Sequence, residues 1–352
     1  NGHGSMLIYS LLYLTGYDLD IEDIKKFRKL GSKTPGHPEV DVTPGIETTT
    51  GPLGQGIANG VGMALSEKLL ASEFNRPGFP IIDHFTYVFL GDGCLMEGLS
   101  HEVCSLAGVM KLSKLICFYD SNGISIDGQI DPWFDEDVKK RFEAYGWNVI
   151  GPLDGHNVND LLVGLNEAID NHNSRDESKF APTLIICKTL IGKGSPSKEG
   201  TAKAHGEALG IEEIKAFKTS LSWGDKPFEI PDEILTAWNA HTIGQARQDA
   251  WDHLFESYAT EYPQKSQRLI NRLACKVDKL KLDKEVFIVI NQFLKKPIAM
   301  ATRKASQKVL NFLGPRFDCL LGGSADLTSS NLTQWVGAEP VRLIGSGKTI
   351  SG

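Results

Sequence analysis

Leu90-Gly91-Asp92-Gly93-Cys94 is the stretch that decides the fold, together with Asp120-Ser121-Asn122-Gly123-Ile124 further along the chain. An apolar, aromatic run at 85–90 precedes the first stretch and predicts a buried strand. A second strand is predicted at 115–119, directly before the second stretch, and a helix-like segment separates the two. A strand, a helix and a strand in this order predict two parallel strands joined by a crossover.

Asp92 and Asn122 are therefore expected at the carboxyl ends of two strands of one sheet, where open α/β sheets bind ligands. A carboxylate, an amide oxygen and a nearby backbone carbonyl are hard oxygen donors that suit Mg²⁺, with phosphate oxygens completing an octahedron. The glycines beside them let backbone N–H groups approach the phosphates. A lone Gly-Asp-Gly is a common turn. The metal hypothesis therefore depends on the spacing of 30 positions (122 minus 92), with a hydrophobic strand before each stretch.

The composition bounds the class of protein. The chain has 352 residues, enough for more than one domain with a sizeable core, and its hydrophobic content of 41% is ordinary for a globular protein. The net charge of −7 argues against nucleic acid or an acidic membrane surface as the main partner. No apolar run approaches the roughly 18 residues of a membrane span. We expect neither a nucleic acid nor a membrane as a partner.

The cysteines and the chain ends carry two further expectations. Six cysteines form no CxxC pair, and several lie in apolar runs, which predicts reduced core thiols of a cytoplasmic protein. They are Cys94, Cys104, Cys117, Cys187, Cys275 and Cys319. The chain begins at Asn1 without a methionine, shows no targeting segment and stops in a turn at Gly352. We expect an excerpt of a longer chain.

Strands and helices alternate along the first part of the chain, which predicts an α/β fold with a doubly wound, mostly parallel sheet. From about Trp223 the residue composition changes, and an acidic, polar helical stretch follows that is typical of a connector between domains. We expect a first domain at 1–222, a helical connector at 223–290 and the truncated start of a second α/β domain at 291–352. The predicted helices are 6–14, 21–30 with Asp20 as its cap, 57–74, 99–111, 135–145, 158–171, 249–280 and 299–312, and the further strands are 147–150, 183–187 and one beginning at Leu320.

Three histidines lie in loops rich in glycine or proline. His3 stands between two glycines at a predicted helix start, and His37 stands between Gly36 and Pro38. His205 follows the flexible loop 191–200, which overhangs the carboxyl edge of the sheet and is of a kind that often closes over substrate. From residue types alone, His3 and His37 are more simply loop histidines, and His205 is open between the two interpretations.

The sequence around these stretches resembles that of the transketolase family. The segments that carry the resemblance are GDGCLMEGLSHEVCSLAG at 91–108 and FYDSNGISIDG at 118–128, followed by RKASQ at 303–307 and GGSADL at 322–327. It runs from Asn1 to about Leu332, and its last part matches the opening of the family's pyrimidine-binding domain. It implies a thiamine-diphosphate-binding fold, thiamine diphosphate held through Mg²⁺ (for which Ca²⁺ can substitute), and a homodimer with the active site at the subunit interface.

The resemblance also implies roles for single residues. The metal ligands would be Asp92, Asn122 and the carbonyl of Ile124. The cofactor contacts would be His3, Gly51, Pro52, Leu53, Gly93, Asn122, Ile126 and His205. The catalytic residues would be His37 and His205, and the sugar-phosphate contacts His37, His205, Arg303 and Ser330. Glu97 and Glu102 would form an acid pair buried at the dimer interface.

Simpler interpretations of several of these residues stay open. Ile126 is also consistent with a core isoleucine, Arg303 with a surface charge and Ser330 with a helix cap. Glu97 and Glu102 are by default exposed charges. The glutamate that protonates the aminopyrimidine ring in this family, an earlier substrate histidine and the C-terminal domain fall outside the 352 residues.

The activity that the resemblance implies is transfer of a two-carbon ketol unit within the cytoplasmic pentose phosphate pathway. The donor is a ketose phosphate such as xylulose 5-phosphate, and the acceptor is an aldose phosphate such as ribose 5-phosphate or erythrose 4-phosphate. A related thiamine-diphosphate synthase, of the dihydroxyacetone synthase or deoxyxylulose-phosphate synthase type, is one alternative. A non-catalytic transketolase-like subunit is the other.

Overall fold

The computed structural model describes residues 1–174, 176, 179–274, 279–317, 319–324, 326–344 and 349–351. The chain forms two compact units, each described by itself. The first consists of Asn1–Ala71, Ile82–Ala250 and Leu343–Thr349, and the second of Ser72–Ile81, Trp251–Arg342 and Ile350–Gly352. The domain boundaries predicted at 222 and 290 stay predictions.

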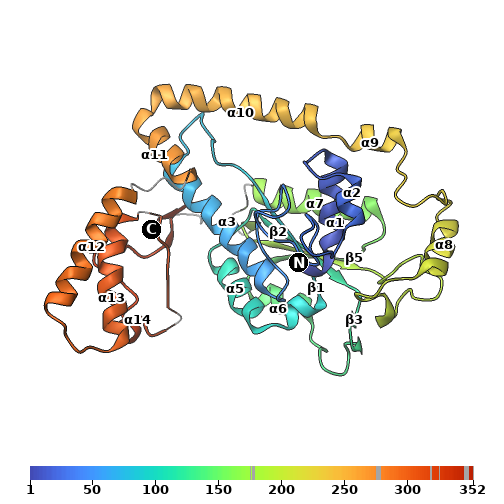
Figure 1. Ribbon diagram of the computed structural model, residues 1–352, viewed down its shortest axis with the longest axis horizontal. Coiled ribbons are helices and arrows are strands. Elements are labelled where there is room, and N and C mark those ends of the chain that lie inside the picture. The colour runs from blue at the N-terminus through green and yellow to red at the C-terminus, as the bar shows by residue number, and fades with distance from the viewer. Residues whose placement is uncertain are drawn as a thin grey trace. The chain divides into compact units, whose positions relative to one another are not determined.

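A four-stranded parallel sheet organises the first unit (Figure 1). Its strands, in spatial order, are β1 (Thr86–Gly91), β2 (Leu115–Ser121), β6 (Thr183–Lys188) and β5 (Asn148–Asp154). Both faces carry buried apolar clusters, because the helices that connect parallel strands pack on the two faces. Ile57, Cys104 and Phe142 bring α3 (Gln55–Phe74), α5 (Gly98–Val109) and α6 (Val138–Ala144) onto one face. Ala168 brings α7 (Val158–Asn173) onto the other. The predicted doubly wound α/β sheet is confirmed.

The strand predicted as buried at 85–90 is buried on one face only. Val88 and Leu90 pack in the core, whereas Tyr87 and Phe89 are about half exposed. The exposed side of β1 lines a cavity of about 530 Å³, which Leu7 of α1 (Ser5–Thr15) also lines. The prediction was wrong in this respect because apolar residues at every position hide an alternation in burial.

The helices of this part of the chain begin within three residues of their predicted starts, and the helix predicted at 57–74 ends at Phe74 as expected, whereas most others end one or more residues away. Asp20 caps α2 (Ile21–Lys25) through a reciprocal capping box with Asp23, as predicted. That helix ends five residues early, and Arg28 shortly beyond its end has a positive φ of 62°. A five-residue helix, α4 (Asp92–Met96), was not predicted, because it is too short to show a periodic pattern. The remaining elements of this part are η1 (Gly2–Gly4), β3 (Ile124–Ser125), β4 (Gly128–Gln129), η3 (Ala202–Ala204), α8 (Ile211–Ser220) and α9 (Asp232–Trp238).

The described part of the second unit is mainly helical. The single helix predicted at 249–280 is divided, because Pro263 begins a new helix. The predicted strand at Leu320 is wrong: Leu320 and Leu321 are 39% and 48% exposed and lie in no strand among the described residues. The elements from α10 onward are α10 (His241–Glu261), α11 (Pro263–Leu273), α12 (Lys279–Lys295), α13 (Thr302–Leu313), η4 (Gly314–Arg316), α14 (Thr328–Asn331), β7 (Arg342–Ile344) and β8 (Thr349–Ser351).

Four cysteines are buried free thiols, as predicted: Cys94, Cys104, Cys117 and Cys187. Burial raises the pKa of the Cys104 thiol to about 12, so this thiol is inert at neutral pH. Cys319 is exposed, contrary to the prediction of a core thiol, and Cys275 lies outside the described residues. None of the helices in the described part of the chain is long and apolar enough to cross a membrane.

Candidate active site

Asp92 lies at the first position of α4, directly after β1. The parallel register places Gly91 beside Asp120, so the Gly-Asp-Gly stretch and the Asp-Ser-Asn-Gly stretch leave the sheet at the same edge. The Asp92 carboxylate joins the two stretches, because it accepts a hydrogen bond from the backbone N–H of Gly123 at 2.9 Å. The predicted adjacency of the two strand ends is present.

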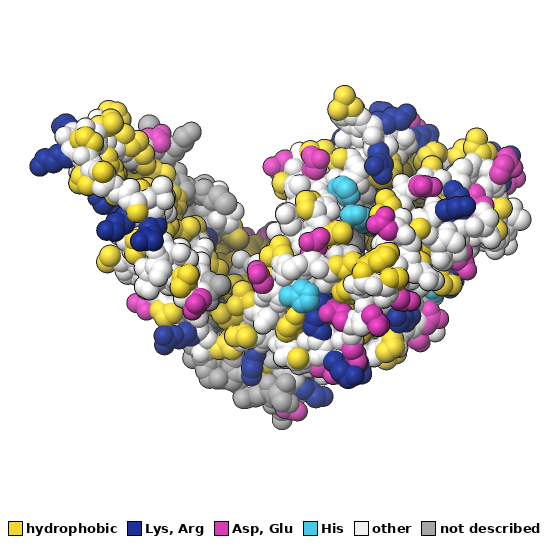
Figure 2. All heavy atoms as spheres, turned by 90° about the horizontal axis from the view of Figure 1, so that it is seen from below, with side chains coloured by type: hydrophobic (Ala, Val, Ile, Leu, Met, Phe, Trp, Pro, Cys, Tyr) yellow, Lys and Arg dark blue, Asp and Glu magenta, His cyan; other side chains and the backbone are white. Residues whose placement is uncertain are grey.

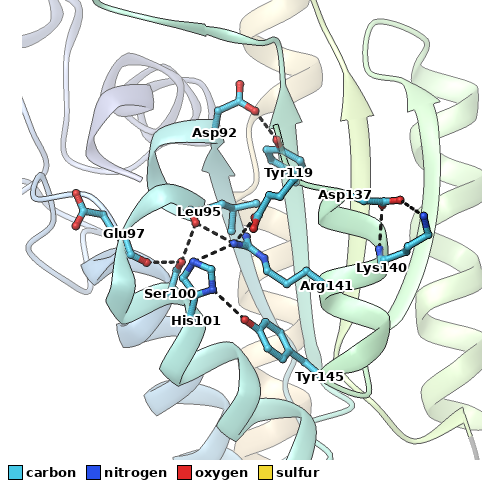
Figure 3. Close-up of polar contacts among 11 residues, drawn as sticks. Asp92, Leu95, Glu97, Ser100, His101, Tyr119, Asp137, Lys140, Arg141 and Tyr145 are labelled. Carbon is cyan, nitrogen blue, oxygen red and sulfur yellow. Dashed lines mark hydrogen bonds and ion pairs between the residues drawn. The ribbon is translucent and has the colours of Figure 1, made fainter. Parts of the chain in front are cut away.

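Asp92 is 5% exposed and its second oxygen accepts a hydrogen bond from the Tyr119 hydroxyl (Figure 3). Burial raises the pKa of the Asp92 carboxyl, and the hydrogen bonds from Tyr119 and Gly123 oppose this rise. Tyr119 was not predicted as a site residue. The only sign of it in the sequence is a hydroxyl-bearing side chain within an otherwise apolar strand.

Asn122 is held in one orientation by its neighbours. Its side-chain oxygen accepts from the N–H of Ile124 at 2.9 Å, and its side-chain nitrogen donates to Asp120 at 3.4 Å. Ile124 starts the short hairpin of β3 and β4, and Ile126 lies in its loop, where it is 71% exposed. The interpretation of Ile126 as a core residue is therefore wrong, and its apolar side chain is available to a ligand.

The donor set at this edge fits a hard cation shared with a diphosphate. It offers one carboxylate, one amide oxygen and backbone carbonyls, and the rest of an octahedron would come from phosphate oxygens. Within the described ranges, no three His, Cys, Asp or Glu side chains gather in a way that could hold a metal by themselves. The space beside Gly123 is open to a ligand, because no atom lies within 4 Å of the position that a Cβ on this residue would take.

Three histidines from distant loops meet in the first unit. The ring centre of His3 lies 5.3 Å from that of His37 and 5.8 Å from that of His205. Partial desolvation by the surrounding loops, followed by the charges of His37 and His205, lowers the pKa of His3 even though its side chain still reaches solvent. His3 and His37 are exposed, and Figure 2 shows histidine side chains reaching the surface of the face drawn there. The three imidazoles are thus close together and open to a ligand.

The loop that carries His37 is anchored from α1. The hydroxyl of Ser5 donates to the carbonyl of Gly36 at 2.9 Å, and the hydroxyl of Tyr9 donates to the carbonyl of Pro35 at 2.8 Å. Both side chains are buried. The rigid placement of His37 that its flanking Gly and Pro predict is therefore reinforced by two hydrogen bonds that connect it to the segment after His3.

Glycines allow the loops of the site to pack against one another. A Cβ on Gly2 would lie 2.8 Å from Gly51 and 2.9 Å from the His37 ring. A Cβ on Gly93 would lie 3.0 Å from the Leu53 side chain. The stretch at 51–53 therefore contacts both the histidine loops and the Gly-Asp-Gly stretch, which brings most of the predicted cofactor residues together.

The loop after β6 is closed by Glu213 of α8, a residue that was not predicted. Its carboxylate accepts from the Ser195 hydroxyl, from the Ser197 N–H at 2.8 Å and from the Ser197 hydroxyl at 2.6 Å. At the base of the loop, the Thr189 hydroxyl donates to Asp120. The loop that was predicted to be flexible is thus tied at both ends. A glutamate on a separate helix gives no sign of this role in the sequence.

The three hydrogen bonds to Glu213 predict a pH-resistant anchor. The hydroxyl of Ser195, then the groups of Ser197, lower the pKa of Glu213 to about 2. A carboxyl with a lowered pKa contributes stability above its ordinary pKa and loses it only as the pH falls toward the lowered value. We expect Glu213→Gln to make tryptic cleavage at Lys193 and Lys198 several-fold faster at pH 7. The neighbouring Glu212→Gln, which removes an exposed ion pair with Lys215, should change nothing, and equal rates in both variants would contradict the anchor.

The comparisons with known proteins agree with this geometry. A family model described as "Transketolase, thiamine diphosphate binding domain" matches residues 1–278. The chain belongs to the transketolase family. Transketolase 1 of Escherichia coli (strain K12) is 52% identical over 350 residues, which cover 99% of this chain and 52% of that protein. A plasmid-encoded transketolase of Cupriavidus necator is 53% identical over 351 residues, which cover 100% of this chain and 51% of that protein.

Solved transketolase structures are similar to this chain over nearly all of its length. One from Pichia stipitis, in complex with sedoheptulose 7-phosphate, gives a TM-score of 0.83 at 44% identity and covers 96% of this chain and 48% of that chain. The transketolase of Leishmania mexicana gives a TM-score of 0.82 at 42% identity, over 95% and 48% of the two chains. The present chain thus spans about half the length of its transketolase relatives.

Of four further residues expected from the transketolase resemblance, only Glu97 lies against the site by described contacts, because a Cβ on Gly54 would be 2.9 Å from its side chain. Glu97 caps the end of α4 and Glu102 lies on α5, and both are exposed in the single chain. Arg303 on α13 and Ser330 in α14 lie in the second unit, and both are also exposed. Ser330 is not a helix N-cap, because Leu327 has that position in α14. The roles of all four stay predictions.

Proposed function

We propose that this chain supplies the diphosphate-binding half of a transketolase active site. The reaction is transfer of a two-carbon ketol unit from a ketose phosphate, such as xylulose 5-phosphate, to an aldose phosphate. The observation that carries the proposal is the packing of the 51–53 stretch against both the His37 loop and Gly93. This packing connects the sheet edge that carries the proposed metal ligands to the cluster of three histidines, within one unit.

The Asp92 carboxylate, the Asn122 amide oxygen and the Ile124 carbonyl would hold Mg²⁺ or Ca²⁺ together with the diphosphate. Bound thiamine diphosphate would supply an electron sink for cleavage of the bond beside the ketose carbonyl. Leu53 and Ile126 would offer apolar contacts to its rings. The N–H groups of the glycine-rich stretches would donate to diphosphate oxygens.

His3 would contact the diphosphate of the cofactor, whereas His37 and His205 would act on the substrate. Because its pKa is lowered, His3 is neutral at pH 7, and a neutral imidazole can donate at one nitrogen and accept at the other. His37 and His205 flank it and would bind substrate hydroxyl groups and move protons as the carbonyl carbon changes geometry. The anchored loops around Ser5 and Glu213 would keep these rings in place and limit the access of water.

Three further parts of the proposal concern the whole protein. Arg303 and Ser330 would bind the sugar phosphate through a guanidinium and a hydroxyl, which suit a phosphate dianion. Glu97 and Glu102 would meet a second copy of the chain in a homodimer. The enzyme would act in the cytoplasmic pentose phosphate pathway.

The experiment is a coupled assay of the full-length protein with xylulose 5-phosphate and ribose 5-phosphate, at saturating thiamine diphosphate and Mg²⁺. We expect turnover in the ordinary enzyme range, about 1–1,000 per second, and its loss after chelation and restoration by Mg²⁺. A folded full-length protein that binds the cofactor and transfers no ketol unit would contradict the proposal.

A further inference from the structure

Arg141 reaches from α6 to the far end of α4, the helix that begins with Asp92. Its side chain is 10% exposed, and its Nη1 donates to the carbonyl of Leu95 at 3.1 Å (Figure 3). Leu95 is fully buried and lies three positions after Asp92. A five-residue helix leaves most of its terminal carbonyls without intrahelical donors, so its end depends on donors from outside. For the Leu95 carbonyl of α4 this donor is Arg141, because the single proton of the Ser100 hydroxyl, 3.3 Å away, lies closer to the carbonyl of Glu97, at 2.7 Å.

His101 of α5 fixes the direction of the guanidinium. Its Nε2 lies 3.1 Å from the same Nη1. A guanidinium can only donate, so Nε2 accepts, and a neutral imidazole then carries its proton on Nδ1. That proton is donated to the hydroxyl oxygen of Tyr145, at 3.0 Å. The ring is thus held in one tautomer between two partners, as Figure 3 shows.

An acidic side chain and two aromatic rings also contact Arg141. Glu136 forms an ion pair with the guanidinium. The rings of Phe134 and Phe142 lie 6.0 and 5.3 Å from its central carbon, within the range of cation–π attraction. The polar contacts with Leu95, His101 and Glu136 all meet at Nη1, so a lysine could keep part of them but would lose the packing of a planar cation beside the two rings.

We propose that Arg141 is a positioning residue that sets α4, and through it Asp92 and Gly93, for the metal and the diphosphate. At the start of α4, the Asp92 carboxylate is held by Tyr119 and Gly123. At its end, Arg141 holds the Leu95 carbonyl. Without the second contact, the helix can tilt about its first residue, and the carboxylate changes direction. This inference rests on the proposed function, because it assumes that Asp92 binds the metal.

The test uses three variants of the full-length protein: Arg141→Met, Arg141→Lys and Lys140→Met. Lys140 is the matched control, because it directly precedes Arg141 in α6, is 81% exposed and contacts only the exposed Asp137 in Figure 3. The first readout is the Kd of thiamine diphosphate at fixed Mg²⁺, measured by titration calorimetry. The second is the alkylation rate of Cys94 in the metal-free protein, measured by peptide mapping. Cys94 lies within α4 and is 4% exposed.

We expect Arg141→Met to raise the Kd about tenfold or more, the cost typical of residues that orient a metal ligand. Cys94 should be alkylated faster, while Cys117 in β2 and Cys187 in β6 keep their rates. Arg141→Lys should lie between this variant and the wild type, because an ammonium can hold the Leu95 carbonyl without the full set of contacts. Lys140→Met should change neither readout.

The outcomes separate the positioning role from simpler ones. An unchanged Kd together with an unchanged Cys94 rate would overturn the proposal. Faster alkylation of all the buried cysteines would also overturn it, since Arg141 would then only stabilise the unit. A wild-type protein that does not bind thiamine diphosphate would refute the proposed function, while the Cys94 rate would still test the positioning. If Arg141→Met fails to fold, the Kd and the alkylation rate of Cys94 are both measured on Arg141→Lys instead.

Discussion

Asp92→Asn should abolish the metal-dependent binding of thiamine diphosphate and leave the metal-free protein at least as stable as the wild type at pH 7. The variant keeps the size of the side chain and removes the only carboxylate of the proposed donor set. Residues that merely orient a metal ligand change metal affinity about 10–100-fold. Loss of the charged ligand itself should therefore weaken binding by at least about 100-fold.

The expected stability follows from the sign of the pKa shift. Burial raises the pKa of Asp92 above its ordinary value, so the folded state binds this proton more tightly than the unfolded state does. The free energy of unfolding therefore falls as the pH rises from the ordinary pKa of 3.8 through the raised one. At pH 7 the ionised carboxylate carries this full cost, and Asn, which does not titrate, avoids it.

Titration calorimetry with Mg²⁺ and thiamine diphosphate tests the first half, and melting of the metal-free protein at pH 4 and pH 7 tests the second. Asp127→Asn is the matched control, because Asp127 is exposed in the hairpin loop near Ile126. Wild-type affinity in Asp92→Asn would refute the metal assignment. A large loss of melting temperature with retained affinity would instead give Asp92 a structural role.

The position of Asp92 and Asn122 could be predicted from the sequence because it follows from chain order. Parallel strands joined by a helix share a carboxyl edge, and the observed pairing of Gly91 with Asp120 is the direct result. The capping role of Asp20 could be predicted for a similar reason, since a cap depends on neighbours within one turn. Local rules and the order of elements therefore predicted the sheet edge.

The partners of these residues could not be predicted in the same way. Tyr119 donates to Asp92 across 27 positions, and Arg141 donates to Leu95 across 46. Neither contact leaves a periodic pattern, because each depends on how two elements pack after the sheet has formed. Glu213 is a similar case, since it binds a loop that lies 16 to 18 positions earlier.

The errors also have physical causes. The run at 85–90 was predicted to be buried throughout, yet Phe89 faces a cavity. The stretch beginning at Leu320 has the composition of a strand but has no paired neighbour among the described residues. Hydrophobic residues show that a segment prefers apolar surroundings, whereas strand formation also requires a partner for the backbone.

His205→Ala should lower the kcat of the full-length enzyme about tenfold or more, at or below the low end of a general acid–base contribution. The fold should lose little, because the described hydrogen bond of this residue comes from its backbone N–H, which donates to the carbonyl of Ala202 at 2.9 Å. The ring lies edge-on to His3 and is half-buried. Its removal therefore takes away a proton-handling group without opening a core cavity.

The same change should raise the pKa of His3, and this can be measured by NMR without any substrate. The charge of His205 is one of the influences that lower the pKa of His3, after burial and the charge of His37. Removing it makes protonation of His3 easier, so the titration should move to higher pH. Glu207→Ala, in the same segment and exposed, is the control for both measurements. Normal turnover per folded molecule combined with a large drop in melting temperature would mean that His205 serves the fold, whereas an unchanged His3 titration would mean that the three rings do not act as one cluster.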